Sequence, residues 1–188
     1  MKLMRLTLWL LISCALLLAP ELRSSAQPAA TVQVLGNFSN VRRAGEDDAL
    51  GYTLRLWKEG NKLFGLFAAY VGPPADPPVG ILEDVKFDPR TGRLSFSARL
   101  STGLVSGPGY DRVASRDRFV FKGVLIRREV RGTLKRSNDL FPDRRLESEK
   151  IRLRRSQFLT ELMMPPPPSY SEWKTWADEV LQRSGPKW

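Results

Sequence analysis

The sequence predicts an all-β protein, an antiparallel meander of about eight short strands closed into a small barrel, with an amphipathic helix near the C-terminal end. Apolar and polar residues alternate with a period of two along most of the chain after the first 30 residues, as half-buried strands require. Tight turns separate these stretches, and no rhythm of alternating strands and helices is present. A barrel is favoured because closure leaves no exposed strand edges, and a two-sheet sandwich is the alternative.

Residues 1–26 are predicted to be a secretory signal peptide. Two positive charges, Lys2 and Arg5, precede an apolar run from Leu6 to Ala19, and the small residues 24–26 lead to a cut before Gln27. The run is shorter than the ~20 residues of a permanent membrane helix, so an uncleaved anchor is the less favoured alternative and no transmembrane span is expected after cleavage. The chain is therefore expected to be exported, either periplasmic or secreted.

The single cysteine, Cys14, offers a second interpretation of the leader. The run Leu11-Ile12-Ser13-Cys14 resembles the bacterial lipobox and would make the protein a lipoprotein anchored through Cys14. Ordinary cleavage is favoured because the apolar stretch continues past the cysteine. Beyond the leader the chain has neither His nor Cys. This excludes disulfides, Ser-His and Cys-His triads and the usual zinc ligands, and it fits a bacterial envelope better than a eukaryotic secretory route.

The barrel is predicted over residues 27–155, beginning with a strand over 31–38. Tyr52, Leu54 and Leu56 share one face of the next strand, which forms a hairpin with the almost wholly apolar stretch 63–71. A second hairpin joins 81–87 to 94–100 through Asp88-Pro89-Arg90-Thr91-Gly92, a strong turn sequence. Strands at 119–125, 130–134 and 150–154 complete the meander. The side chains expected to face the core include Leu54, Leu56, Phe87, Phe96, Phe121 and Leu134.

Two segments of the barrel domain are predicted to be long loops. Residues 71–78 contain four prolines, and residues 101–117 are rich in Gly and Ser. The second is expected at one rim of the barrel, and loops of this length are often functional.

Residues 156–188 form a tail of different character. A short helix is predicted over 157–164, then a stiff extended linker over Pro165–Pro168, then an amphipathic helix over 171–183. Ser169 and Glu172 fit a capping box at its start, and Gly185-Pro186 ends it. This helix is expected to pack on the barrel of its own chain, and the alternative is a docking helix for a partner or a lipid surface.

Positive charge is concentrated in one part of the chain. The full sequence has 30 Lys and Arg against 20 Asp and Glu, and residues 112–155 alone carry a net charge of +9. If these side chains, Arg127 and Arg128 among them, share one face, they would attract nucleic acid, anionic glycans or phospholipid head groups. A solvated outer face is the alternative.

No catalytic, cofactor-binding or metal-binding residue is predicted, and the chain is not expected to be an enzyme. Glu46-Asp47-Asp48 lies in a polar loop. Glu83 and Asp84 are neighbours in a strand and point to opposite faces, so they cannot form a glycosidase pair together. Glu83 on the otherwise apolar face could be a buried acid inside the barrel, but such a residue more often meets an Arg or a strand end. Ser171 and Lys174 match a Ser-x-x-Lys pattern without its companion motifs, and Asn37-Phe38-Ser39 is a glycosylation sequon relevant only in a eukaryotic host.

The hairpin rhythm from Gly51 to Leu100, GYTLRLWKEGNKLFGLFAAYVG followed by LEDVKFDPRTGRLSFSARL, resembles small exported bacterial proteins with lipocalin-like (calycin) barrels. Gly36-Asn37-Phe38 stands where lipocalins carry Gly-x-Trp, with Phe in place of Trp. The resemblance implies a cup for a small apolar ligand. The sequence therefore predicts a non-enzymatic binding or accessory protein of the envelope, and the alternative is a peripheral protein held by an Arg-rich face to an anionic polymer or membrane.

Overall fold

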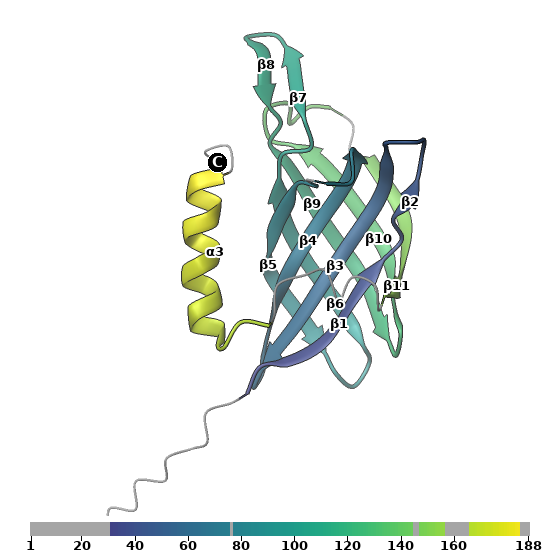
Figure 1. Cartoon of the computed structure of the whole chain (residues 1–188), viewed down its shortest axis with the longest axis vertical. Helices are drawn as coiled ribbons and strands as arrows, with labels where there is room; N and C mark the ends of the chain where they lie inside the picture. Colours follow the sequence, from purple (N-terminus) through teal and green to yellow (C-terminus); the bar gives the residue numbers. More distant parts are fainter. Residues whose placement is uncertain (1–30, 76, 145–146, 157–165, 185–188) are drawn as a thin grey trace, which may run out of the picture.

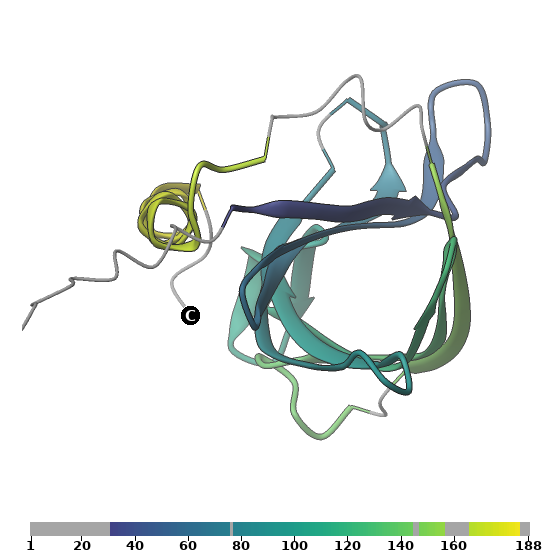
Figure 2. The same ribbon diagram turned by 90° about the horizontal axis from the view of Figure 1, so that it is seen from below.

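Eight antiparallel strands close into a barrel in the computed structural model, which describes residues 31–75, 77–144, 147–156 and 166–184, without the side chains of 180–184 (Figures 1 and 2). The strands of the wall are β1 (Gln33–Ser39), β3 (Ala49–Glu59), β4 (Lys62–Gly72), β5 (Val79–Asp88), β6 (Arg93–Leu100), β9 (Asp117–Ile126), β10 (Glu129–Asn138) and β11 (Glu147–Arg155). Strand β1 closes the ring because it pairs with both β3 and β11. The predicted barrel is confirmed, and the sandwich alternative is wrong.

The two predicted hairpins have the turns that the sequence indicates. Between β3 and β4 the chain reverses at Gly60, which has a φ of +56°. Between β5 and β6, the Asp88 carboxylate accepts hydrogen bonds from Arg90 N at 2.9 Å and from Thr91 Oγ1 at 2.7 Å. Gly92 completes this turn with a φ of +70° and donates its N–H to Asp88 O at 2.8 Å.

The core fills the barrel with inward-facing side chains from its strands. Five of the six predicted core residues, Leu54, Leu56, Phe96, Phe121 and Leu134, are at most 2 % exposed, and Phe87 packs against them half-buried. The Phe96 ring lies 5.1 Å from that of Phe121 and 5.8 Å from that of Phe67, measured between centroids. Aromatic rings therefore occupy the middle of the barrel.

The register of β5 differs from the alternation expected from the sequence. Strict alternation predicts Ile81, Glu83, Val85 and Phe87 on one face, but a bulge between Glu83 and Lys86 shifts the pairing with β6. Asp84 occupies the bulge with a φ of 51°. As a result Leu82 is buried in the core with Val85 and Phe87, whereas Ile81 and Glu83 face outward.

Two facing glycines make room for the Phe121 ring. Gly123 and Gly132 are register partners on β9 and β10, and a Cβ at either would lie 2.6–2.8 Å from Phe121 Cζ. We expect Gly132→Ala to lower the free energy of unfolding by about 1–3 kcal/mol, because the ring or the strand has to move. Gly72→Ala is the matched control, since nothing lies within 4 Å of its Cβ position. Urea unfolding measures both, and equal midpoints would contradict this account.

The segment 101–117 is not the irregular loop that its composition predicts. It contains a second, two-stranded sheet, β7 (Leu104–Gly107) and β8 (Tyr110–Ala114), which projects from one end of the barrel (Figure 1). The hairpin reverses at Gly109, with a φ of 78°. Its Tyr110 ring meets the Phe141 ring edge-on at 5.8 Å.

A two-residue strand, β2 (Arg42–Arg43), also pairs with β3.

The C-terminal helix α3 (Tyr170–Ser184) forms and packs on the outside of its own barrel, as expected (Figure 2). Ser169 Oγ accepts a hydrogen bond from Glu172 N at 3.1 Å, so Ser169 caps the helix. Trp173 and Ala177 are buried against Trp57 and Phe64 of the barrel wall. Three predicted segments lie outside the described residues: the signal peptide, the helix over 157–164 and residue 165 of the linker. The rest of the linker, Pro166–Pro168, forms neither helix nor strand.

Candidate functional site

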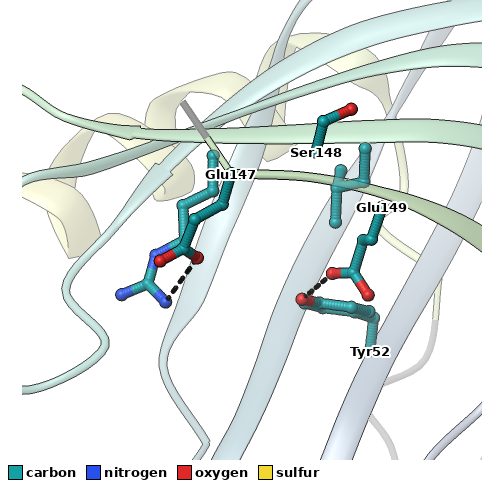
Figure 3. A pocket seen from close by; sticks show the side chains of 6 residues that line it. Tyr52, Glu147, Ser148 and Glu149 are labelled. Atoms are coloured by element: carbon teal, nitrogen blue, oxygen red, sulfur yellow. Dashed lines mark hydrogen bonds and ion pairs between the residues drawn. The ribbon is translucent and has the colours of Figure 1, made fainter. Parts of the chain in front are cut away.

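A polar pocket opens in the mouth of the barrel, at the end from which β7 and β8 project. Its volume is about 230 Å³, and its lining is Tyr52, Leu134, Arg136, Glu147, Ser148 and Glu149 (Figure 3). Alternation places Tyr52 on the inward face of β3 with Leu54, and Glu149 on the inward face of β11 with Ile151. The hydroxyl of Tyr52 donates a hydrogen bond to Glu149, and Arg136 pairs with Glu147 at 3.7 Å.

Tyr52 forms the boundary between this pocket and the core. Its ring stacks on Phe67 at 5.4 Å and meets Phe119 edge-on at 6.2 Å. Burial raises the pKa of the Tyr52 hydroxyl, and the hydrogen bond to the Glu149 carboxylate raises it further. Tyr52 therefore remains a protonated donor near neutral pH and does not serve as a base there.

A buried carboxylate lies behind Arg136. Asp117 is 1 % exposed and accepts hydrogen bonds from Thr102 Oγ1 at 2.6 Å, from Arg136 Nη2 at 3.2 Å and from Asn138 Nδ2 at 3.2 Å, as well as from Ser115. Burial works to raise the pKa of Asp117, but these donors and the Arg136 charge outweigh it, so that the pKa lies below its ordinary value. The network ties the base of the β7–β8 hairpin to β10.

The mouth pocket has polar groups but no arrangement that identifies a reaction. Each carboxylate already has a partner, Tyr52 for Glu149 and Arg136 for Glu147. Over the described part of the chain, no three acidic side chains are grouped in a way that would hold a metal ion. The arrangement can bind a small polar group by hydrogen bonds and charge.

The acids considered from the sequence do not converge on this pocket. Because of the β5 bulge, Glu83 lies on the outer face, where its carboxylate accepts from Arg99 Nε at 3.0 Å. It meets an Arg, as the favoured interpretation expects, and is not an acid inside the barrel. Asp84 accepts a hydrogen bond from Ser97 Oγ at 3.3 Å. Residues 46–48 form an exposed loop before β3.

The remaining sequence motifs also lie away from the mouth pocket. Ser171 and Lys174 are exposed on α3, on the outside of the barrel. Asn37 of the sequon is only 8 % exposed within β1, and Phe38 is fully buried in the core. These motifs contribute no side chain to the mouth pocket.

The outer surface of β9, β10 and β11 is strongly basic. Seven exposed cations project from it, and we call them the basic face: Arg118, Lys122, Arg131, Lys135, Lys150, Arg152 and Arg154. Glu129 is the one acidic residue among the outward positions of these three strands. The strands lie side by side in the barrel wall, and α3 covers a different part of that wall (Figures 1 and 2).

Four of these seven cations take part in no ion pair over the described residues, and the other three are paired. Glu129 pairs with Arg152 at 2.6 Å and with Arg131 at 3.9 Å, and Asp139 pairs with Arg118 at 3.7 Å. Over the described residues, the lysines of the basic face take part in no ion pair. The positive excess of residues 112–155 therefore gathers largely on one outer face, although Arg136 faces the mouth pocket and Arg127 and Arg128 lie in the exposed β9–β10 turn.

The mouth pocket is not predicted from the sequence, although the sequence contains part of the pattern that indicates it. Glu147 and Glu149 continue the alternation of Ile151 and Leu153, and Asp117 continues that of Phe119 and Phe121. Inward acids at the end of an apolar face indicate a polar rim. Their partner Tyr52 lies 97 residues from Glu149 and is identified only by the closed barrel.

Comparisons of the chain with protein-family models, with curated proteins and with solved structures found no match. Within the described residues, no helix has both the length and the apolar character needed to cross a membrane.

Proposed function

We propose that the chain is an exported, non-enzymatic binding protein of the cell envelope that attaches to an anionic partner through its basic face. The observation that carries the proposal is the gathering of seven exposed cations around a single acid on three neighbouring strands. Such a face produces a positive potential that attracts polyanions, and each phosphate, sulfate or carboxylate it neutralises releases a counterion. Export rests on the charged, apolar and small-residue parts of residues 1–26.

A cup for a small apolar ligand, as the resemblance to lipocalin-like barrels implies, has less support. The closed eight-stranded meander is compatible with that resemblance. However, Phe67, Phe96 and Phe121 occupy the barrel interior, and the pocket at the mouth is lined by charged groups. An apolar ligand would have to displace core side chains.

The basic face is tested by charge reversal away from the mouth pocket. We expect Arg131→Glu with Arg154→Glu to raise the dissociation constant for heparin, a linear sulfated probe, by about tenfold or more at low salt, because two favourable contacts become repulsive. The wild-type affinity should fall steeply as salt rises. Binding of the purified mature protein is measured by fluorescence anisotropy at several salt concentrations.

The matched control is Lys62→Glu with Lys174→Glu, which makes the same change in net charge at exposed positions beside α3. An equal loss in both double variants would mean that net charge, and not this face, governs binding. A wild-type protein that fails to bind heparin or anionic phospholipid vesicles at low salt would contradict the proposal.

A further inference from the structure

Five side chains form a row across the outer surface of five neighbouring strands. Lys86 of β5 is the register partner of Ser95 of β6, and Ser95 is that of Lys122 of β9. Lys122 in turn pairs with Thr133 of β10, and Thr133 with Lys150 of β11. Lysines and small hydroxyl residues therefore alternate across the sheet. We call these five residues the lysine row.

The lysines of this row are available to a ligand. Lys86, Lys122 and Lys150 are all exposed, and in the described parts of the chain no hydrogen bond or ion pair engages their ammonium groups. Neighbouring strands are ~4.8 Å apart, so successive lysines are separated by about 10 Å at the backbone. The short side chains of Ser95 and Thr133 leave open space between the longer lysines.

The first half of the row borders a shallow groove. This groove has a volume of about 600 Å³ and lies over β6, between β5 and β9; its lining is Lys86, Phe87, Asp88, Arg93, Leu94, Ser95, Lys122, Gly123 and Val124. Arg93 adds a third cation beside the two lysines. The one acid, Asp88, is engaged by the turn through Arg90 N and Thr91 Oγ1. The charges at the groove are thus mainly positive, although most of its surface is apolar.

The course of the row around the barrel determines which partner can reach all of it. A row of register partners runs perpendicular to strands that tilt by about 35–45°, so in an eight-stranded barrel each step turns by about 22–30° around the axis. The four steps of the row therefore span about a quarter to a third of the circumference. Lys86 and Lys150 therefore project in directions that differ by about 90–120°, on a closed wall that Figure 2 shows end-on. A flat bilayer contacts one end of the row at a time, whereas a flexible chain contacts both ends.

The residues between the cations favour a sugar polymer over a nucleic acid. Single-stranded nucleic acids bind through exposed aromatic platforms on which bases stack. Among the described outward positions of β6, β9, β10 and β11 there is no aromatic side chain. Hydroxyl groups of Ser95 and Thr133 stand between the lysines instead, where they can hydrogen-bond to sugar hydroxyls and ring oxygens.

We propose that the lysine row binds a flexible, anionic polysaccharide that wraps part-way around the barrel, across β5, β6, β9, β10 and β11. Its carboxylate or sulfate groups meet Lys86, Lys122 and Lys150, and its hydroxyls meet the residues between them. This inference rests on the proposed function and names its partner. It also extends the binding surface beyond the basic face, to β5 and β6.

The test compares single variants at the two ends and the middle of the row. The variants are Lys86→Gln, Lys122→Gln and Lys150→Gln, with Lys174→Gln on α3 as the matched control. For a heparin oligosaccharide long enough to span the row, each row variant should reduce the slope of log K against log salt by about 0.7, and the control should leave it unchanged. Anionic phospholipid vesicles and an oligothymidylate are measured beside it, and equal melting temperatures establish that the variants are folded.

The wrapped polysaccharide is supported if both Lys86→Gln and Lys150→Gln weaken heparin binding but do not both weaken binding to vesicles. If both end variants bind heparin as the wild type does while Arg131→Glu with Arg154→Glu does not bind, the row is overturned and the basic face stands. Oligothymidylate that binds as tightly as heparin overturns the choice of a sugar polymer. Failure of the wild type to bind any of these probes overturns the row and the proposed function together.

Discussion

Phe96→Ala should lower the free energy of unfolding by about 3–5 kcal/mol, because it removes a ring from the centre of a closed barrel. Phe96 is 2 % exposed and contacts two other rings, those of Phe67 and Phe121. Aromatic pairs of this kind contribute ~0.5–1.5 kcal/mol beyond the area they bury. Domains of this size have a total stability of about 5–15 kcal/mol, so the variant should be only marginally folded at room temperature.

Equilibrium unfolding in urea, followed by tryptophan fluorescence, measures this effect. Trp57 and Trp173 are buried where α3 meets the barrel and report on the native packing. Leu104→Ala is the matched control, because Leu104 is a large apolar residue that is 60 % exposed on the β7–β8 hairpin, and its truncation should change stability by less than about 0.5 kcal/mol. An unchanged midpoint for Phe96→Ala would show that β6 does not have the register described.

The alternation of residues predicted most of the barrel because it follows directly from strand geometry. In a strand, successive side chains point to opposite faces, so Phe96 and Phe121 could be assigned to the core without knowing which strands are neighbours. The same alternation accounts for the outward positions of Arg131 and Arg152, which lie next to the buried residues of β10 and β11. Ser169 and Glu172 likewise marked the start of α3, because capping is a local interaction.

The parts that could not be predicted depend on backbone irregularity or on contacts distant in sequence. The bulge at Asp84 adds a residue to β5 and reverses the face of Glu83, and nothing in the local alternation indicates a positive φ there. The hairpin formed by β7 and β8 was hidden by its glycines, which break the alternation. The mouth pocket depends on the closure of β1 onto β11, because Tyr52 and Glu149 lie 97 residues apart in the sequence.

Neighbour relations between strands were also needed for the surface inference. Lys86, Lys122 and Lys150 are separated by long stretches of sequence, and their alignment in one row depends on the register of four strand pairs. In particular, β6 and β9 are neighbours only because the β7–β8 hairpin projects out of the barrel and leaves the wall continuous. The positions of the cations can be counted along the sequence, but their alignment in one row follows only from the register of the strands.

Asp117→Ala should be the most damaging change to a polar group, because it leaves the hydrogen-bond donors of four residues without their acceptor, two at the hairpin base and two on β10. Loss of one partner from a fully buried ion pair costs ~3–5 kcal/mol. Arg136 retains access to water, with 34 % of its side chain exposed, so we expect a somewhat smaller loss of about 2–3 kcal/mol at neutral pH. Asp139→Ala is the control, because that carboxylate makes a 3.7 Å pair at the surface and should contribute less than about 1 kcal/mol.

The pH dependence distinguishes this charge network from simple packing. The pKa of Asp117 is lowered in the folded protein, so its stabilisation is fully present above the pKa of an unfolded Asp, ~3.9, and is lost as the pH falls through the folded value. The difference in unfolding free energy between the wild type and Asp117→Ala should therefore be constant from about pH 5 to 8 and should shrink toward pH 3. Urea titrations at pH 7, 5 and 3 measure it. A difference that is the same at all three values would show that Asp117 stabilises the hairpin base by filling space, and not by its charge.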